Sequence, residues 1–479
     1  MIQFLLNDRP VTEEQLDPNL TVLSYLRTHQ RRCGTKEGCA SGDCGACSVT
    51  LGSVVDGKLT YQTVNSCLML VSGLQGKQLI TVEDLRQGKS LHPVQQAMVD
   101  CHGSQCGFCT PGFVMSLFSL QKNQPEWNRQ QAEHALAGNL CRCTGYRSIM
   151  AAAEQSLSDV QPDSFDRQAQ QVTEQLMNLT HEAIQTLEKN GRTCFIPKTV
   201  QQLAECCIAH PDAALLAGGT DLSLLITQRD QHLPKMISLG QVDALKACGE
   251  DDKHYQLGAA ASLEHIADFM ATRIPGFAGM LTRFASLQIR QLGTLGGNLA
   301  NASPIGDASP TLLALNASLL LQHGDTQRTV TLDGFFTGYR QTVLRPGEFI
   351  HTILIPKVTV SPDFVAWKVS KRLDDDISAV FAAFNIHTDN GIVTRAHIAF
   401  GGMAATPLRA VACEQALCGA ALSPETLARA CQALEATFQP LSDFRASADY
   451  RLQVACNLLR RYVYRSNGLA ITEVSRYVS

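Results

Sequence analysis

Residues 38–47 read Gly-Cys-Ala-Ser-Gly-Asp-Cys-Gly-Ala-Cys, and this stretch decides the fold of the N-terminal part. It places Cys39, Cys44 and Cys47 in a C-x4-C-x2-C spacing that Cys67 completes. Four thiolates in this spacing are typical of a plant-type 2Fe-2S cluster. Glycine permits the dihedral angles of a tight loop, and backbone N–H groups in such a loop can donate to the cluster. Zinc or disulfides are the alternatives, but zinc favours two compact cysteine pairs.

A second set of four cysteines lies further along the chain. It consists of Cys106 and Cys109, with two residues between them, and of Cys141 and Cys143, with one residue between them. Pro111 can open a helix directly after the first pair. Taken alone, this set could bind zinc. Because an iron-sulfur loop precedes it, a second 2Fe-2S cluster is favoured, and two clusters in one chain predict one-electron transfer.

The composition is that of an ordinary globular protein. The chain has 479 residues, 45% hydrophobic and 18% charged, with a formal net charge of −4. No strongly basic face is implied, so nucleic acid is not an expected partner. We expect no membrane span and no signal peptide, because the chain begins as a first strand. Many free thiols favour a reducing compartment, and we expect a cytoplasmic protein.

Hydrophobic periodicity predicts an α+β protein of several domains. Residues 1–85 alternate strands with one helix, and residues 86–158 contain four helices that hold the second cysteine set. Residues 159–192 are polar and are predicted to form a linker with some helical character that crosses the surface. Residues 193–365 and 366–479 mix strands and helices in two further domains.

Two glycine pairs stand out in the third domain. The first follows an apolar strand in Leu215-Leu216-Ala217-Gly218-Gly219-Thr220-Asp221, and the second lies in Thr294-Leu295-Gly296-Gly297-Asn298. Without side chains, the backbone N–H groups of such loops can approach a phosphate. A tight turn is the simpler alternative for either loop. Downstream of two iron-sulfur sets, the two loops together predict a flavin, which exchanges single electrons for pairs.

The polar run at residues 368–377 reads Lys-Val-Ser-Lys-Arg-Leu-Asp-Asp-Asp-Ile between apolar strands. Charge runs are usually solvated loops. Here the flanking strands could direct the run towards a pocket. A last motif, from Asp443 to Arg451, fits either a functional or a packing role.

The order of these motifs resembles the molybdenum hydroxylases along essentially the whole chain. The motifs are the C-x4-C-x2-C loop, the segments Gln-Cys-Gly-Phe-Cys-Thr-Pro-Gly and Cys-Arg-Cys-Thr-Gly-Tyr, the two glycine loops, Ala-Ser-Pro-Ile-Gly-Asp and Gly-Gly-Met. Within that family, the run at 370–377 looks most like the small subunit of bacterial xanthine dehydrogenases.

The resemblance implies an α+β architecture of four domains. These are a ferredoxin-like β-grasp domain, a four-helix 2Fe-2S domain, an FAD-binding domain of the vanillyl-alcohol-oxidase type and a C-terminal domain like that of CO dehydrogenase flavoproteins. It also implies an NAD+-dependent oxidoreductase that requires a larger molybdopterin-binding partner, in a heterotetramer with two copies of each subunit. Electrons from hypoxanthine or xanthine oxidation to urate would pass through the second cluster, the first cluster and FAD to NAD+. No residue of this chain would act on the purine.

The resemblance also assigns roles to individual residues. Gln105 and Cys143 would lie against the pterin of the partner. FAD would be contacted by Leu215, Leu216, Ala217, Gly218, Gly219, Thr220, Asp221, Phe284, Thr294, Leu295, Gly296, Gly297, Asn298, Asp307 and Lys368. Asp374 is the candidate for an acidic position close to the flavin that influences nicotinamide binding. The alternatives are the same subunit of an aldehyde or N-heterocycle hydroxylase, and a stand-alone electron carrier.

Overall fold

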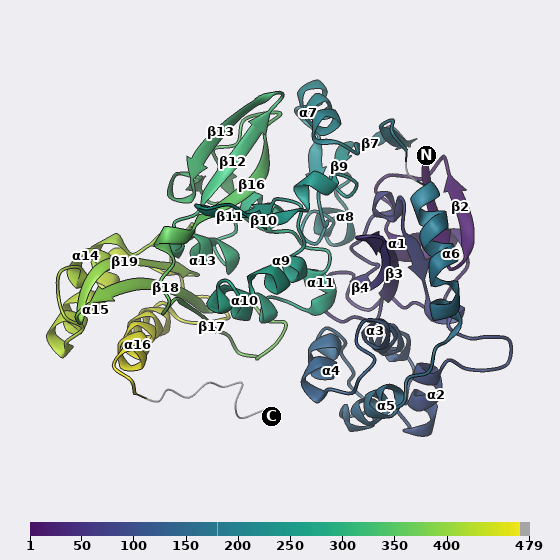
Figure 1. The fold of residues 1–479 in the computed structure, drawn as a ribbon, viewed down its shortest axis with the longest axis horizontal. Helices are drawn as coiled ribbons and strands as arrows, with labels where there is room; N and C mark the ends of the chain where they lie inside the picture. The colour runs from purple at the N-terminus through teal and green to yellow at the C-terminus, as the bar shows by residue number, and fades with distance from the viewer. Residues whose placement is uncertain (180, 470–479) are drawn as a thin grey trace. The chain divides into compact units, whose positions relative to one another are not determined.

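The computed structural model describes residues 1–179 and 181–469 and divides into two compact units (Figure 1). The first unit contains Met1–Asp243 and Ser286–Gly293. The second contains Ala244–Ala285 and the described part of Thr294–Ser479. Residues 470–479, at the end of the predicted C-terminal domain, lie outside the described residues. No helix within the described ranges has the length and apolar character that crossing a membrane requires.

A five-stranded sheet in the order β2-β1-β5-β3-β4 begins the first unit. Strand β1 is parallel to β5, and the other neighbours are antiparallel. Asp56 and Gly57 join β3 to β4 with φ angles of 49° and 75°, as a type I′ hairpin turn requires. The elements are β1 (Ile2–Leu6), β2 (Arg9–Glu13), α1 (Val22–Ser24), η1 (Tyr25–His29), β3 (Ser48–Val55), β4 (Lys58–Asn65), η2 (Val71–Leu74), β5 (Gln78–Ile80) and η3 (Val82–Asp84).

The four predicted helices of the next segment are confirmed. They are α2 (Pro93–Asp100), α3 (Thr110–Asn123), α4 (Arg129–Leu136) and α5 (Arg147–Leu157). Proline occupies the first turn of both α2 and α3, where its missing N–H leaves no helical hydrogen bond unmade. Phe113, Leu117 and Phe118 of α3 are fully buried in the core of this bundle. Because α3 is the central helix, the residues that begin it are held rigidly.

The predicted linker is more ordered than the sequence suggests. Helix α6 (Ser164–Asn178) occupies half of it and buries Val172 and Leu176 against Leu5 of the first sheet. Its polar composition reflects only its exposed face. The helical character predicted for this stretch is confirmed, and three apolar positions on one face are sufficient to hold the helix against its neighbours.

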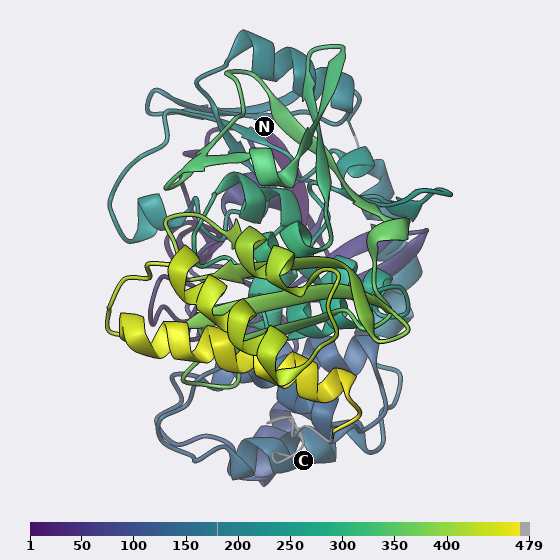
Figure 2. The ribbon, with the colours of Figure 1, turned by 90° about the vertical axis from the view of Figure 1, so that its left-hand side faces the viewer.

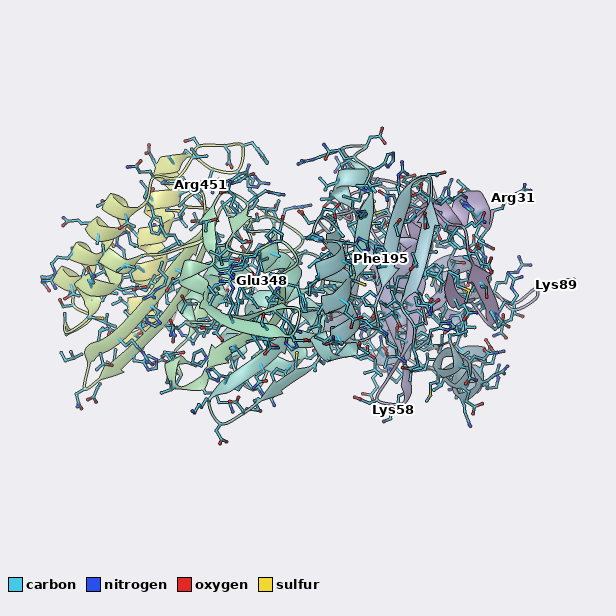
Figure 3. The ribbon with its side chains drawn as sticks, turned by 90° about the horizontal axis from the view of Figure 1, so that it is seen from above. Arg31, Lys58, Lys89, Phe195, Glu348 and Arg451 are labelled. Carbon is cyan, nitrogen blue, oxygen red and sulfur yellow. The ribbon has the colours of Figure 1, made fainter. Side chains whose placement is uncertain are left out.

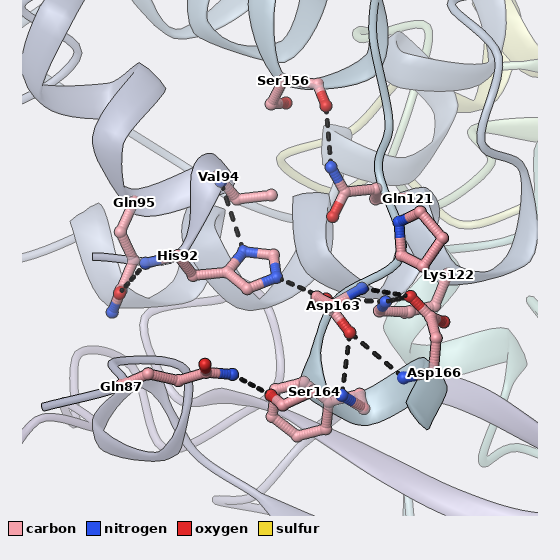
Figure 4. Close-up of polar contacts among 12 residues, drawn as sticks. Gln87, His92, Val94, Gln95, Gln121, Lys122, Ser156, Asp163, Ser164 and Asp166 are labelled. Atoms are coloured by element: carbon pink, nitrogen blue, oxygen red, sulfur yellow. Dashed lines mark hydrogen bonds and ion pairs between the residues drawn. The ribbon is translucent and has the colours of Figure 1, made fainter. Parts of the chain in front are cut away.

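A buried ionic cluster ties α6 to the helical bundle (Figure 4). Asp163 caps α6, and its carboxylate lies 2.7 Å from both His92 Nε2 and Lys122 Nζ. Although burial alone would raise it, hydrogen bonds from His92 and Lys122, together with the charge of Lys122, hold the pKa of Asp163 below its ordinary value. Gln121 of α3 donates to the carbonyl of Ser156 at 2.7 Å nearby.

A four-stranded sheet in the order β6-β7-β9-β8 completes the first unit. Strand β9 is parallel to both β7 and β8, so the ends of β8 and β9 lie at the same edge. The short helix α11 (Leu287–Arg290) also belongs to this unit. The other elements are β6 (Gln185–Lys189), β7 (Arg192–Ile196), α7 (Val200–Ala209), β8 (Ala214–Leu216), α8 (Leu224–Thr227) and β9 (Lys235–Ser238).

The second unit begins with an antiparallel sheet in the order β10-β11-β16-β12-β13. Glu348, labelled in Figure 3, is buried at its edge and forms a two-pronged ion pair with Arg328, both bonds at 2.7 Å. The elements are η4 (Asp243–Leu245), β10 (Cys248–Glu250), β11 (His254–Gly258), α9 (Leu263–Met270), α10 (Pro275–Thr282), α12 (Leu295–Ala300), α13 (Ala308–Ala314), β12 (Ser318–His323), β13 (Thr326–Thr331), η5 (Leu332–Gly334), β14 (Phe336–Gly338), β15 (Gln341–Thr342), β16 (Phe349–Pro356) and η6 (Lys357–Thr359).

A second antiparallel sheet, in the order β17-β18-β19-β20, follows in the same unit. Helices α14 (Val411–Leu417), α15 (Pro424–Thr437) and α16 (Ala448–Ser466) lie over one face of it (Figure 2). The strands are β17 (Val365–Val369), β18 (Val380–Asp389), β19 (Ile392–Gly401) and β20 (Leu408–Arg409). The α+β fold class predicted from the sequence is confirmed.

Arg451 of α16 anchors that helix to the sheet (Figure 3). Its side chain is only 3% exposed and donates to the carbonyl oxygens of Ala379 and Gly402. A third bond, 2.7 Å long, joins it to Asp443. The motif from Asp443 to Arg451 is thus explained by packing.

We expect Arg451→Met to lower the free energy of unfolding of the second unit by about 2–3 kcal/mol, because two buried carbonyls lose a charged donor. Arg445→Met is the matched control, since Arg445 lies at the surface, 3.8 Å from Asp443, and should change it by less than about 1 kcal/mol. Scanning calorimetry of both variants would test this. Equal stability of the two variants would contradict the anchoring role.

Candidate functional site

Three cysteines of the first set, Cys39, Cys44 and Cys47, lie in the loop between η1 and β3, and the fourth, Cys67, follows β4. Gly42 and Gly45 have φ angles of 83° and 67°, and Ala40 has 53°. These left-handed residues turn the chain around Cys39, whose Sγ accepts hydrogen bonds from the amides of Ser41 at 3.4 Å and Asp43 at 3.3 Å. The predicted inward N–H groups are therefore present around this thiol.

The four thiols of this set contact one another in a chain. The Cys39 thiol is hydrogen-bonded to those of Cys44 and Cys67, and Cys47 is hydrogen-bonded to Cys67. These bonds lower the pKa of Cys39 and Cys47 and raise the pKa of Cys44 and Cys67. Asn65 Nδ2 also donates to Cys47 Sγ at 3.7 Å. All four side chains thus converge on one point, with Cys47 and Cys67 buried.

The four thiols of the second set form two pairs. Cys106 and Cys143 lie 3.6 Å apart, sulfur to sulfur, and both are exposed. Cys109, which caps α3, is hydrogen-bonded to the buried Cys141, and burial followed by that bond raises the pKa of Cys109 to about 12. Thr144 Oγ1 donates to Cys141 Sγ at 3.2 Å. This set therefore spans the boundary between the core of the bundle and its surface.

Each convergent set of four thiols fits a diiron centre. A 2Fe-2S cluster takes four thiolates, which is two for each iron. Each set supplies that number, and the Thr144 hydroxyl and the Ser41 and Asp43 amides supply hydrogen bonds to sulfur.

The first glycine loop follows β8 and has no side chains at Gly218 and Gly219. A Cβ atom at Gly218 would lie 1.8 Å from the carbonyl oxygen of Leu292, and Gly219 has a φ angle of 73°. Among the described residues, no group accepts a hydrogen bond from the amides of Gly218, Gly219 or Thr220. Successive unpaired amides around a left-handed glycine form an anion-binding concavity.

Ser223 strengthens this assignment, although sequence reasoning missed it. Its hydroxyl is completely buried, and no partner for it exists within the described ranges. It lies 2.9 Å from the position that a Cβ of Gly219 would occupy. A buried hydroxyl without a partner is costly unless a ligand supplies one. The residues present therefore fit the phosphate of a flavin dinucleotide.

The second glycine loop has a different role. Thr294 caps α12, and the amides of Gly296, Gly297 and Asn298 donate to Ala259, to the Thr294 hydroxyl and to the Thr294 carbonyl. The N-terminus of α12 thus uses these three amides, and the predicted contact of this loop with FAD stays a prediction. What remains is the buried Asn298 Oδ1, which has no partner within the described ranges.

Asp307 and Lys368 are brought together in the second unit. Their side chains are 4% and 6% exposed and form an ion pair of 2.9 Å, and Ser378 donates to the same carboxylate at 2.6 Å. A buried pair with an added hydrogen bond fixes the ends of β17 and α13.

Phe284 is half-buried against the core of this unit, whereas Asp374 lies exposed in the loop that follows β17.

Gln228 is a second residue that the sequence did not reveal. At the end of α8, its Nε2 donates to the carbonyls of Cys39 at 3.1 Å and Ala40 at 3.0 Å. It thus joins the segment after the first glycine loop to the first cysteine set. No sequence signal could identify it, because its partners lie far away along the chain. Gln105 is exposed next to Cys106.

Four protein-family models match successive parts of the chain. They are a 2Fe-2S iron-sulfur cluster binding domain at residues 4–72, a [2Fe-2S] binding domain at 81–154, the FAD binding domain in molybdopterin dehydrogenase at 185–358 and the CO dehydrogenase flavoprotein C-terminal domain at 365–466. The chain therefore contains 2Fe-2S-binding and FAD-binding domains.

Curated relatives extend over most of the chain. The xanthine dehydrogenase of Drosophila subobscura is 34% identical over 91% of this chain, and that of Emericella nidulans is 33% identical over 100% of it. The chain spans only 37% and 40% of the lengths of these two relatives.

Solved structures are similar over shorter parts. A carbon monoxide dehydrogenase chain from Hydrogenophaga pseudoflava matches with a TM-score of 0.53 and 28% identity, covering 56% of this chain and 94% of that one. Quinoline 2-oxidoreductase from Pseudomonas putida matches with a TM-score of 0.52 and 25% identity, covering 56% and 94%. With the two thiol sets and the bare glycine loop, these likenesses lead to one conclusion: the chain belongs to the molybdenum hydroxylase family and carries its iron-sulfur and FAD-binding domains.

Proposed function

We propose that this chain is the electron-transfer subunit of a xanthine dehydrogenase. Electrons released when a molybdopterin centre oxidises hypoxanthine or xanthine to urate pass through the second cysteine set, then the first set, then FAD, and leave on NAD+. The observation that carries the proposal is that one compact unit contains two sets of four converging thiols and a glycine loop whose amides have no partner among the described residues. The xanthine dehydrogenase names of relatives that match nearly the whole chain support the substrate.

Eight cysteines are the proposed cluster ligands in this scheme. They are Cys39, Cys44, Cys47 and Cys67 for the first cluster and Cys106, Cys109, Cys141 and Cys143 for the second. The amides of Ser41 and Asp43 stabilise the negative charge on Cys39. Burial of Cys47 and Cys67 keeps water away from the first set. The second set is the proposed place where electrons enter from a partner chain. The exposure of Cys106, Cys143 and Gln105 supports this role.

FAD, when bound, supplies the exchange between one-electron and two-electron transfer. In the first unit, Leu215 to Asp221 are proposed to bind it, with the amides of Gly218 to Thr220 and the Ser223 hydroxyl on a phosphate. In the second unit, the proposed contacts are Phe284, Thr294 to Asn298, Asp307 and Lys368, with Asp374 near the nicotinamide position. The Asn298 carboxamide oxygen, which lacks a partner within the described ranges, is the best-supported of these.

The molybdopterin centre is proposed to reside on a larger partner chain in an assembly with two copies of each. The carbon monoxide dehydrogenase chain from H. pseudoflava, 94% of which is matched, supports a separate flavoprotein chain. An aldehyde or N-heterocycle hydroxylase is the second candidate, favoured by the likeness to quinoline 2-oxidoreductase. The substrate pocket would lie on the partner in either case. A stand-alone electron carrier is the third.

Co-purification with substrate assays separates the three candidates. We expect the tagged chain to bring down a larger molybdenum-containing chain, and the complex to reduce NAD+ with hypoxanthine or xanthine. Activity on aldehydes or N-heterocycles alone would favour the second candidate, and recovery of the chain by itself would favour the carrier.

Cys109→Ser should abolish one of two iron-sulfur signals in the paramagnetic resonance spectrum of the reduced protein. Purine-driven NAD+ reduction should be lost, whereas NADH-driven dye reduction at FAD should remain, because the second set lies upstream of the flavin. Cys101→Ser is the control, since Cys101 lies outside both sets and bonds Gln155. Equal loss of both activities would contradict the proposed electron order.

Gly218→Ala should greatly reduce the flavin content of the purified protein, because the new Cβ would collide with the Leu292 carbonyl at 1.8 Å. Both iron-sulfur signals should persist. Gly240→Ala is the matched control, since its Cβ would meet nothing closer than 3.6 Å. Flavin absorbance per chain measures the effect, and full flavin content in Gly218→Ala would exclude this loop from the FAD site.

A further inference from the structure

Two buried thiols face each other across helices α15 and α16 of the second unit. Cys431 lies in α15 and Cys456 in α16, and the two residues are 4% and 2% exposed. The Cys456 thiol donates to the carbonyl oxygen of Cys431 at 3.7 Å, and the Cys431 thiol donates to the carbonyl oxygen of Cys456 at 4.0 Å. The two thiols are also hydrogen-bonded to each other. Each sulfur thus points at the other residue, as the two halves of a disulfide must.

The surroundings make the two thiols unequal. The hydrogen bond from Cys456 lowers the pKa of Cys431 to about 7, and the charge of Arg460 adds to this effect, against burial and Glu435. The same hydrogen bond, followed by burial, raises the pKa of Cys456. Because the thiolate is the reactive form of cysteine, Cys431 is the nucleophile of the pair and Cys456 is placed to react second.

The neighbouring thiol of Cys413, in α14, shows what burial alone produces. Cys413 is completely buried and interacts electrostatically with Cys431, and burial is the main cause that raises its pKa. A thiol of this kind stays protonated and inert. The pair differs also in its position, because Cys456 Sγ contacts Glu435 Oε1 at 3.8 Å and Glu435 is exposed. The two thiols therefore lie directly beneath the surface of the helix pair, within reach of a small oxidant.

We propose that Cys431 and Cys456 are a reversible oxidation site, at which hydrogen peroxide converts the two thiols into a disulfide that joins α15 to α16. The Cys431 thiolate attacks one peroxide oxygen, so that an S–O bond forms, the O–O bond breaks and the released hydroxide takes a proton to become water. The Cys456 sulfur then attacks this sulfenic acid. The S–S bond forms, the S–O bond breaks, and the leaving hydroxide takes the Cys456 proton. Two thiols are oxidised and one peroxide is reduced to water, independently of the proposed function.

The disulfide would close the chain between the two helices into a loop. A cross-link of this kind restricts the unfolded chain more than the folded one, and it therefore stabilises the fold. The closed loop includes Phe444, whose carbonyl oxygen accepts from Lys371 Nζ at 2.8 Å, and it also includes Arg451. Oxidation is thus expected to raise the unfolding temperature of the second unit, and reduction should reverse the change.

Peptide mapping tests the site directly. The full-length chain, as purified, is treated with hydrogen peroxide, its remaining thiols are blocked, and it is digested with trypsin, which cleaves between the two cysteines at Arg445 and Arg451. We expect the peptides of Cys431 and Cys456 as one linked species that dithiothreitol separates, and a higher calorimetric midpoint for the oxidised chain. Recovery of both peptides with free thiols, or of Cys431 as an unlinked sulfinic acid, would overturn the proposal.

Two variants separate this pair from its neighbour. Cys456→Ser should give no linked species, and peroxide should leave its calorimetric midpoint unchanged. Cys413→Ser is the matched control, since it removes the adjacent buried thiol, and its linked species and its increase in midpoint should equal those of the unaltered chain. A link from Cys431 to Cys413 would overturn the assignment. The peptide map of the unaltered chain is decisive by itself, whichever variants fold.

Discussion

The convergence of four thiols at each of two places is the constraint on which the first unit depends. Sulfur atoms can meet around a cluster only if the chain bends sharply and carries no bulky side chains there. Ala40, Gly42 and Gly45 supply left-handed backbone for the first set, and Tyr146 supplies it next to the second. This requirement also decides what surrounds the sets, since loops of this kind have few contacts of their own. A sheet core on one side and the buried helix α3 on the other must hold them.

Polar contacts add to the apolar clusters that join the parts of the first unit. Asn139 and Gln288 link the first cysteine loop, the helical bundle and the segment that contains α11. Gln228 links the residues after the first glycine loop to the first cysteine loop. Buried amides are satisfied only in one arrangement, so they specify geometry where an apolar contact would tolerate sliding. Electron transfer depends on fixed separations, and this is the property that such contacts protect.

The two glycine loops show how one sequence pattern can serve two physical purposes. After β8, Gly218 and Gly219 leave their amides without partners among the described residues, beside the buried Ser223 hydroxyl. Before α12, Gly296 allows close packing on Ala259, and its amide is consumed by that contact. Each glycine pair is required by close approach of the backbone, but only the first pair leaves its amides without partners among the described residues. The amides of the second pair are used at the N-terminus of α12.

The sequence alone determined the elements and the chemistry. Cysteine spacing identified both ligand sets, and hydrophobic periodicity located the helices of the bundle and the strands of both α+β parts, because these signals are local. It predicted only some helical character for α6, whose three buried residues are diluted by a polar face, and it did not show that the amides of the second loop have partners within the chain. Only the tertiary structure brought Cys456 to Cys431, Gln228 to Cys39 and Lys368 to Asp307, since each partner is chosen by the packing of distant segments. Long-range hydrogen bonds cannot be predicted from the local sequence pattern, because that pattern does not say which donor will meet which acceptor.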